Sequence, residues 1–317
     1  MSAPDKSIDN NAQLAIDIVE HMEINPQIAA EGVHKLIHEL TLDIRQINEE
    51  LLISAVRQHT DNEVLAKEAV RNRAIAEAMQ YSILWPQPEK RFRGLTVASF
   101  YEPATSEALV GGDFFDAFKL ANKSIMLLVG DVTGKGLKAA ARTVEVIFAA
   151  RAFAQDYMSP AATLSRLNKF ICEFHNGEDE SIGNALIVMC IIVIDPSTGG
   201  AQIASAGAEP PLILRASGAT EEIPTRGLIL GIDSGFVYES MDLRLDFGDT
   251  LLMFTDGITE ARFGRDFFGY ERLLETARAA AETGTLHDIG KTIMDAAHAY
   301  TSGRLNDDAC LLVAQRA

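Results

Sequence analysis

The sequence has few cysteines and no long apolar run, and both absences exclude classes of protein. Its three cysteines are an odd number, so they cannot all pair in a disulfide framework. Cys190 and Cys310 lie in apolar runs, which predicts buried, reduced thiols. Residues 1–11 are polar and acidic, unlike a secretory signal, and no segment reaches the roughly eighteen uninterrupted apolar residues of a membrane span. We therefore expect a protein of the reducing cytoplasm.

Basic residues are also scarce. The chain has 28 Lys and Arg against 45 Asp and Glu, which gives a formal net charge of -17 at pH 7. A field of this sign repels phosphate, so we expect neither nucleic acid nor a membrane surface as a partner. The charge suits a protein that gathers carboxylates around cations, although solubility alone is a sufficient explanation for it.

The chain is long enough for about two domains, and glycine and proline are rare in its first part. Leu40, Ile44, Ile47 and Leu51 recur in steps of four and three, which is typical of a coiled-coil or bundle seam. We predict a helical domain over residues 1–60 and a linker helix over 61–88, capped by Thr60 or Asp61. The pattern fits a bundle packed on itself as well as a module that dimerises or binds a partner.

From Arg93 onward the sequence changes to short apolar runs separated by glycine, proline and aspartate. Two consecutive helices are expected between Gly136 and His175, and two more between Tyr270 and Tyr300. Runs of strands alternating with pairs of helices favour an α+β sandwich with antiparallel sheets over residues 89–317. The predicted strands are Leu95–Tyr101, Phe115–Leu120, Ser124–Asp131, Asn184–Ile194, Ala201–Ser205, Leu212–Arg215, Val237–Leu245, Thr250–Thr255 and Asp308–Gln315.

Aspartates stand at the ends of these predicted strands, mostly beside glycine. Asp113 precedes one strand, Asp131 and Asp256 each follow one, and Asp307 begins the last. A single Asp-Gly pair usually marks a turn, but four sites next to apolar strands indicate a shared centre. Converging carboxylates repel one another by several kcal/mol, at an effective dielectric of about 20, unless a cation neutralises them.

The residue types at this centre select the metal and the chemistry. Oxygen ligands without His or Cys favour Mg²⁺ or Mn²⁺ over Zn²⁺. Two such ions sharing an aspartate activate a water for in-line attack on phosphorus, which needs no nucleophilic side chain. In agreement, no Ser or Cys lies in a nucleophile elbow.

Six ordered motifs carry a family resemblance: GGDFFD (111–116), GDVTGKG (130–136), SAGAEPP (205–211), LILGI (228–232), GDTLLMFTDGITEA (248–261) and DDACLLV (307–313). Together they resemble the bacterial SpoIIE/RsbU-type branch of the protein phosphatase 2C (PP2C) superfamily. The resemblance implies an αββα sandwich holding two Mn²⁺ or Mg²⁺ ions. It implies metal ligation by the Asp113, Asp131, Asp256 and Asp307 carboxylates and the Val132 carbonyl, with Asp308 as an alternative to Asp307.

The implied reaction is hydrolysis of a phosphoserine or phosphothreonine ester by metal-activated water. The usual substrate in this branch is a phosphorylated anti-sigma-factor antagonist, a STAS-domain protein, in a partner-switching pathway. The helical domain is similar in kind to those through which RsbU-like phosphatases dimerise and receive an activating protein. An alternative is a pseudophosphatase that binds partners without turnover. Departures from the family pattern are Lys135, Ala208 and Ala309-Cys310.

Overall fold

The structure is a computed structural model that describes residues 4–21, 26–84, 89–104, 112–134, 137–175, 186–282 and 284–317. The chain divides into two compact units, Met1–Ala69 and Val70–Ala317. In the described ranges we find no helix with the length and apolar character that crossing a membrane requires. The three cysteines are free and buried, which confirms the prediction for Cys190 and Cys310.

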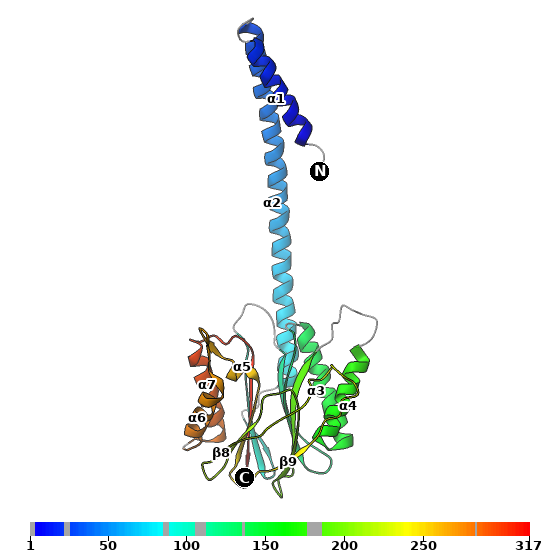
Figure 1. Cartoon of the computed structure of the whole chain (residues 1–317), viewed down its shortest axis with the longest axis vertical. Coiled ribbons are helices and arrows are strands. Elements are labelled where there is room, and N and C mark those ends of the chain that lie inside the picture. The colour runs from blue at the N-terminus through cyan, green and yellow to red at the C-terminus, as the bar shows by residue number, and fades with distance from the viewer. Residues whose placement is uncertain are drawn as a thin grey trace. The chain divides into compact units, whose positions relative to one another are not determined.

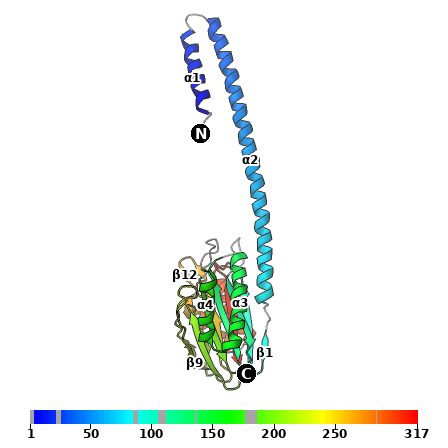
Figure 2. The ribbon, with the colours of Figure 1, turned by 90° about the vertical axis from the view of Figure 1, so that its right-hand side faces the viewer.

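The first unit consists of a helix that folds back along a second one (Figure 2). Helix α1 spans Pro4–His21, and α2 begins at Pro26. Ile18 of α1 is buried, and the Asn11 side-chain amide donates a 3.1 Å hydrogen bond to Asp43 of α2. The predicted helical character of this region is thus confirmed.

Helix α2 runs without a break from Pro26 to Leu84, so the prediction of a helix start at Thr60 or Asp61 is wrong. The Thr60 hydroxyl donates instead to the Val56 carbonyl, four residues earlier in the same helix. No glycine or proline near this point interrupts the helix, so a threonine that would serve as a cap is accommodated in its interior. The predicted boundaries at residues 60 and 88 remain predictions, and residues 85–88 lie outside the described residues.

The sandwich domain, residues 89–317, has two antiparallel sheets between two layers of helices (Figure 1). This confirms the predicted α+β sandwich. The first sheet has the order β1 (Lys90–Phe92), β2 (Leu95–Glu102), β13 (Ala309–Arg316), β10 (Thr250–Phe254), β7 (Leu212–Leu214) and β8 (Thr220–Glu222). The second has the order β3 (Asp113–Lys119), β4 (Ile125–Val132), β5 (Ile187–Ile194), β6 (Gly200–Ala206) and β9 (Met241–Arg244).

Each sheet is covered by its own pair of helices. Helices α3 (Leu137–Tyr157) and α4 (Pro160–His175) pack on the second sheet, and α6 (Gly269–Ala281) and α7 (Leu286–Tyr300) pack on the first. A short helix, α5 (Asp256–Thr259), follows β10, and β11 (Arg262–Phe263) pairs with β12 (Asp266–Phe267) in a small hairpin.

The central strand β13 shows why this architecture needs continuous apolar runs. Cys310 and Leu312 belong to the core cluster between the sheets, whereas Leu311 and Val313 belong to the cluster under α6 and α7. Successive side chains of a strand point to opposite faces, so a strand buried on both faces has no polar alternation. Strand β13 begins directly after two acidic residues, Asp307 and Asp308.

One predicted strand is much shorter than expected. Of Val237–Leu245, residues Met241–Arg244 form β9. The Tyr238 hydroxyl donates to the Leu228 carbonyl at 2.7 Å, and its backbone N–H donates to Ser165. These hydrogen bonds hold Tyr238 against a loop and α4, so the apolar residues before Met241 do not join the sheet.

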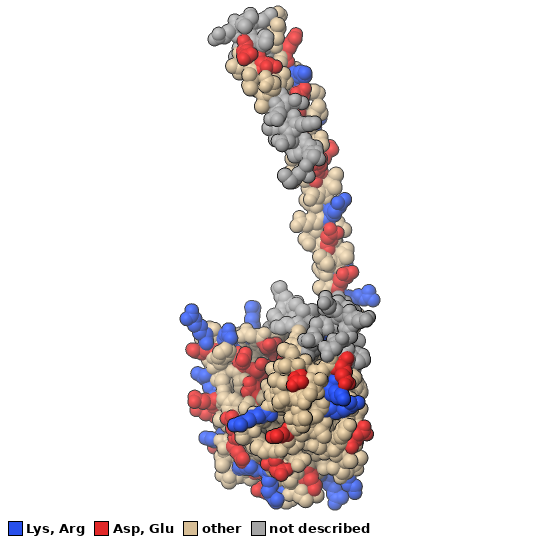
Figure 3. Space-filling model, turned by 45° about the vertical axis from the view of Figure 1, so that its right-hand side comes forward, with Lys and Arg blue, Asp and Glu red and all other residues tan. Residues whose placement is uncertain are grey.

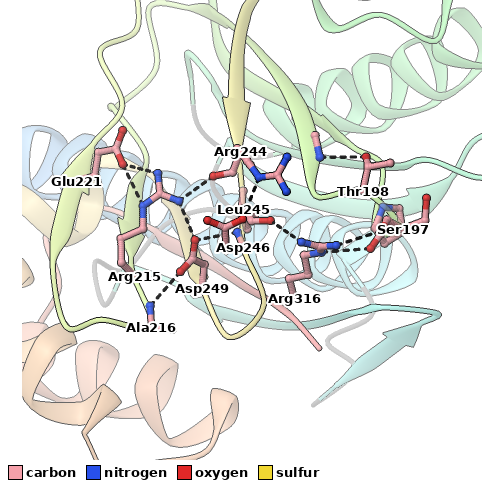
Figure 4. Close-up of polar contacts among 12 residues, drawn as sticks. Ser197, Thr198, Arg215, Ala216, Glu221, Arg244, Leu245, Asp246, Asp249 and Arg316 are labelled. Carbon is pink, nitrogen blue, oxygen red and sulfur yellow. Dashed lines mark hydrogen bonds and ion pairs between the residues drawn. The ribbon is translucent and has the colours of Figure 1, made fainter.

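Arginines from both sheets and their neighbouring loops form a network of polar contacts, in which Arg215 is partly buried and Arg316 is buried (Figure 4). Arg215 forms ion pairs with Glu221 and the buried Asp249. Burial alone would raise the pKa of Asp249, but hydrogen bonds from the Ala216 N–H, Arg215 and the Asp246 N–H outweigh it and lower that pKa. These contacts connect Ala216, Glu221, Asp246 and Asp249 through one arginine.

Arg316 is the member of this group with the largest expected effect on stability. It is 3% exposed and donates to the carbonyls of Pro196, Leu245 and Ser197 at 3.2, 3.0 and 3.1 Å. Arg316→Met is expected to lower the free energy of unfolding by about 2–4 kcal/mol, since it leaves three carbonyls without their donor. Urea denaturation measures the change.

Arg244→Met provides the matched control. Arg244 is largely exposed and pairs with the equally exposed Asp246, so its replacement is expected to cost about 0.5 kcal/mol or less. Equal losses for the two variants would contradict the importance given to the buried carbonyl contacts.

Candidate metal centre

Asp113 and Asp131 face each other across two neighbouring strands. Asp113 begins β3, Asp131 lies next to the end of β4, and the two are direct partners in the antiparallel register. Directly opposite residues have Cβ atoms about 4.5–5.5 Å apart on the same face of the sheet. Asp113 is 4% exposed, so a costly carboxylate pair is built into the end of the second sheet.

Thr255 links this pair to the other sheet. It directly follows β10 and is 4% exposed. Its hydroxyl donates to Asp113 Oδ2 at 2.6 Å and accepts from the Cys310 backbone N–H at 2.9 Å. Sequence reasoning missed this role, because the bond joins residues 142 positions apart. The signal available was its place directly before Asp256 in the TDG motif.

Asp256 is the first residue of α5 and lies in the same region. The next residue, Gly257, lies so close to β13 that an added Cβ would be 1.8 Å from the Asp308 carbonyl oxygen. A residue without a side chain is therefore required for α5 to approach the start of β13. This approach brings Asp256 close to Asp307.

Asp307 and Asp308 have different surroundings, which bears on the choice between them. Asp308 is 3% exposed, and its two carboxylate oxygens accept hydrogen bonds from the Tyr101 hydroxyl at 2.9 Å and the Ala104 N–H at 2.7 Å. Asp307 is exposed, and its charge raises the pKa of both Asp131 and Asp256. These contacts show that Asp308 holds the 101–104 segment, and the choice of Asp307 as the ligand remains a prediction.

The carboxylates shift one another's protonation. Burial, followed by the charge of Asp131, raises the pKa of Asp113 well above its ordinary value. Burial and the charges of Asp256 and Asp307 raise the pKa of Asp131 to about 6. Burial, Glu260 and Asp307 raise the pKa of Asp256. Acids from both sheets thus lie within electrostatic reach of one another. Figure 3 shows acidic side chains spread over the visible face of this domain, some of them on its upper part.

The backbone beside Asp131 fits a bound cation. A Cβ atom on Gly112 would lie 2.0 Å from the Val132 carbonyl oxygen and 2.4 Å from Asp131 Oδ1. Glycine therefore leaves these two oxygens unobstructed by a side chain, and hard oxygen donors of this kind are what Mg²⁺ and Mn²⁺ prefer. Within the described ranges, no three His, Cys, Asp or Glu side chains already stand together as a ligand set. The assignment of Asp113, Asp131, Val132, Asp256 and Asp307 as ligands remains a prediction.

A pocket of about 60 Å³ opens next to these residues. Asp131 and Asp256 both line it, so the two aspartates lie on one side of the molecule, as the metal hypothesis requires. Ala208 and Glu209 line another part of the wall. Glu209 was not predicted as a site residue. Its position in the SAGAEPP motif was the available signal.

Comparison with known proteins agrees with this geometry. Residues 121–317 match the SpoIIE family, described as Stage II sporulation protein E, which is more than half of the chain. The chain belongs to the SpoIIE family. This confirms the resemblance inferred from the six motifs.

Two relatives show how much of the chain is shared. Protein IcfG of Synechocystis sp. is 30% identical over 222 residues, which cover 62% of this chain and 34% of IcfG. Phosphoserine phosphatase RsbU of Bacillus subtilis is 25% identical over 269 residues, covering 83% of this chain and 75% of RsbU. This chain thus spans about a third of the length of IcfG.

Solved structures confirm the fold. The RsbU and RsbW domains of Rv1364c from Mycobacterium tuberculosis match with 29% identity and a TM-score of 0.58, over 70% of this chain and 60% of that one. The SiaA-PP2C domain of Pseudomonas aeruginosa matches with 17% identity and a TM-score of 0.59, over 83% of this chain and 99% of that one. The sandwich domain is therefore PP2C-like.

The structure describes two of the three places where the sequence departs from the family pattern. Ala208 lines the pocket, and the Cys310 backbone N–H donates a hydrogen bond to the Thr255 hydroxyl. Lys135 lies outside the described residues. The two departures that the structure describes leave all four predicted aspartate ligands in place.

Proposed function

We propose that this protein is a metal-dependent protein serine/threonine phosphatase. The observation that carries the proposal is the meeting of acids from both sheets: Asp113 and Asp131 are opposite each other in the second sheet, and Asp131 lines one pocket with Asp256, which follows β10 of the first sheet. Membership of the SpoIIE family and the 25% identity to phosphoserine phosphatase RsbU support the reaction class.

Two Mn²⁺ or Mg²⁺ ions, when bound, supply an activated water and neutralise charge on the phosphoryl group. Asp113, Asp131, Asp256, Asp307 and the Val132 carbonyl would hold them. Thr255 keeps Asp113 oriented through its short hydrogen bond, and Gly112 keeps the approach to Asp131 open. RsbX, which shares the fold at 15% identity with a TM-score of 0.52, is described in complex with magnesium.

The proposed substrate is a phosphorylated STAS-domain anti-sigma-factor antagonist in a cytoplasmic partner-switching pathway. Support comes from the similarity to RsbU and to a protein that carries RsbU and RsbW domains. Association with a second copy or an activator is proposed through α2, where Leu40, Ile44, Ile47 and Leu51 are 42–63% exposed. A helix seam with so much exposed apolar surface is typical of an interaction site.

A phosphate-release assay with one glycine variant tests the proposal. With Mn²⁺, the full chain is expected to release phosphate from p-nitrophenyl phosphate and from a phosphoserine STAS protein, and EDTA is expected to stop the release. Gly112→Ala is expected to lower the rate about 10–100-fold, because its methyl group collides with the Val132 carbonyl and Asp131.

Gly235→Ala is the matched control, since a Cβ there meets its nearest atom, Asp233 Oδ1, at 3.4 Å. It is expected to keep full activity. Absence of turnover with either substrate, while all four aspartates are intact, would indicate a pseudophosphatase. Turnover that survives EDTA would contradict the role of metal.

A further inference from the structure

Two hydrogen bonds hold the part of the pocket wall that contains Ala208 and Glu209. The Ala208 N–H donates to Ser205 Oγ at 3.2 Å, and the Tyr270 hydroxyl donates to the Pro210 carbonyl. The backbone is therefore fixed on both sides of Glu209, which lines the pocket together with Asp131 and Asp256. Since Ala208 has a small side chain, it leaves space in the pocket next to Glu209.

Among the described residues, the charged groups that act on the Glu209 carboxylate are acidic. In the part of the chain that the structure describes, it forms no hydrogen bond or ion pair. It is half-buried, and its charged neighbours are Asp256, Glu260 and Glu222. A carboxylate in such a place attracts a cation.

The phosphate of the substrate is not the group that Glu209 would contact, because a carboxylate and a phosphate repel each other. A protein substrate also presents the side chains around its phosphorylated residue. A lysine or arginine there would find an unpaired carboxylate in a partly desolvated pocket, where charge complementarity gives specificity. The guanidinium of arginine suits a carboxylate especially well.

We propose that Glu209 determines substrate specificity by selecting phosphoproteins with a lysine or arginine close to the phosphorylated serine or threonine. The inference rests on the phosphatase function proposed above and adds a substrate class to it. The same carboxylate repels an acidic side chain next to the phosphorylated residue and gains no ion pair from a neutral one.

Binding of two matched peptides tests this inference. Both carry a hydrolysis-resistant phosphonate analogue of phosphoserine, followed in one by arginine and in the other by citrulline, which has nearly the same shape without the charge. In the presence of Mn²⁺, the full chain is expected to bind the arginine peptide about tenfold more tightly, equivalent to about 1.4 kcal/mol. Fluorescence anisotropy measures both dissociation constants.

Three variants assign the preference to one side chain. Glu209→Gln is expected to reduce the arginine-to-citrulline ratio to about one, and Glu209→Asp to keep a preference, because the charge remains. Glu239→Gln removes an exposed glutamate that does not line the pocket and is expected to leave the ratio unchanged.

Equal binding of the two peptides by the unaltered chain would overturn the inference. So would a Glu209→Gln variant that weakens both peptides to the same extent, since that result assigns Glu209 to the metal centre or the fold. Selective binding of the arginine peptide without phosphate release from the corresponding phosphoserine peptides would confirm the preference of Glu209 for a basic residue, but would refute the phosphatase function and with it the role of that preference in substrate choice.

Discussion

Asp131→Asn is expected to abolish phosphatase activity and to stabilise the metal-free protein at neutral pH. The substitution keeps the shape of the side chain and removes a ligand charge, so the rate is expected to fall at least about a thousandfold, or about 4 kcal/mol. The same charge is unfavourable without metal, because Asp131 is partly buried and lies near the charges of Asp256 and Asp307. Loss of activity and gain of stability are thus expected in one variant.

The raised pKa of Asp131 determines whether the stability of the metal-free protein rises or falls with pH. The pKa of Asp131 is raised from 3.8 to about 6 in the folded chain, so the folded state binds this proton more tightly than the unfolded state does. The stability of the metal-free protein therefore falls as the pH rises through about 4 to 6, and the penalty is fully present above that range. Its size is on the order of 3 kcal/mol.

Thermal unfolding in EDTA between pH 4 and pH 8 measures the effect. The midpoint of Asp131→Asn is expected to exceed that of the unaltered chain at pH 7 and to approach it at pH 4. Asp266→Asn, at an exposed position in β12, is expected to change neither stability nor activity. An Asp131→Asn protein that keeps Mn²⁺-dependent turnover would contradict the predicted ligand role.

Thr255→Val is expected to lower the free energy of unfolding by about 2–3 kcal/mol. The substitution conserves volume but removes the donor to Asp113 and the acceptor of the Cys310 N–H, both of which are buried. The hydrogen bond from Thr255 lowers the pKa of Asp113, so its loss makes that carboxylate still harder to ionise. Activity is therefore expected to fall together with stability.

Thr255→Ser distinguishes the contribution of the hydroxyl from that of the methyl group, because serine keeps the hydroxyl alone. It keeps both hydrogen bonds and is expected to retain most of the stability and activity that Thr255→Val loses. Urea denaturation and phosphate release, measured on the same preparations, provide the comparison. A valine variant as stable as the unaltered chain would show that the link between the sheets has no energetic importance.

Much of this centre was predictable from local sequence, because an aspartate at the end of an apolar strand is visible without knowing the fold. Asp131 and Asp256 were found in this way, and they line one pocket. The TDG motif marks Thr255 as a residue beside the site, but its hydrogen bond to Asp113 was not predictable, because Asp113 lies in β3 of the other sheet, 142 residues away. Glu209 was missed for the same reason: its acidic neighbours come from distant segments.

The errors in the fold also have physical causes. Thr60 carries the capping residue type, but the same hydroxyl is accommodated inside a helix by bonding to Val56. The edge strands β1 and β8 are three residues each, too short to show an alternating pattern. The choice between Asp307 and Asp308 depends on which carboxylate is occupied by Tyr101 and the Ala104 N–H, which adjacent sequence positions cannot distinguish.

Calorimetric titration of Mn²⁺ into the metal-free full-length chain tests most directly whether acids from both sheets jointly hold cations. Two ions per chain are expected, with more protons released at pH 6 than at pH 8, because carboxyl groups with raised pKa values must ionise to bind metal. Asp131→Asn is expected to bind fewer ions and release fewer protons. Binding that is unchanged in this variant, or no binding by the unaltered chain, would contradict a shared metal centre.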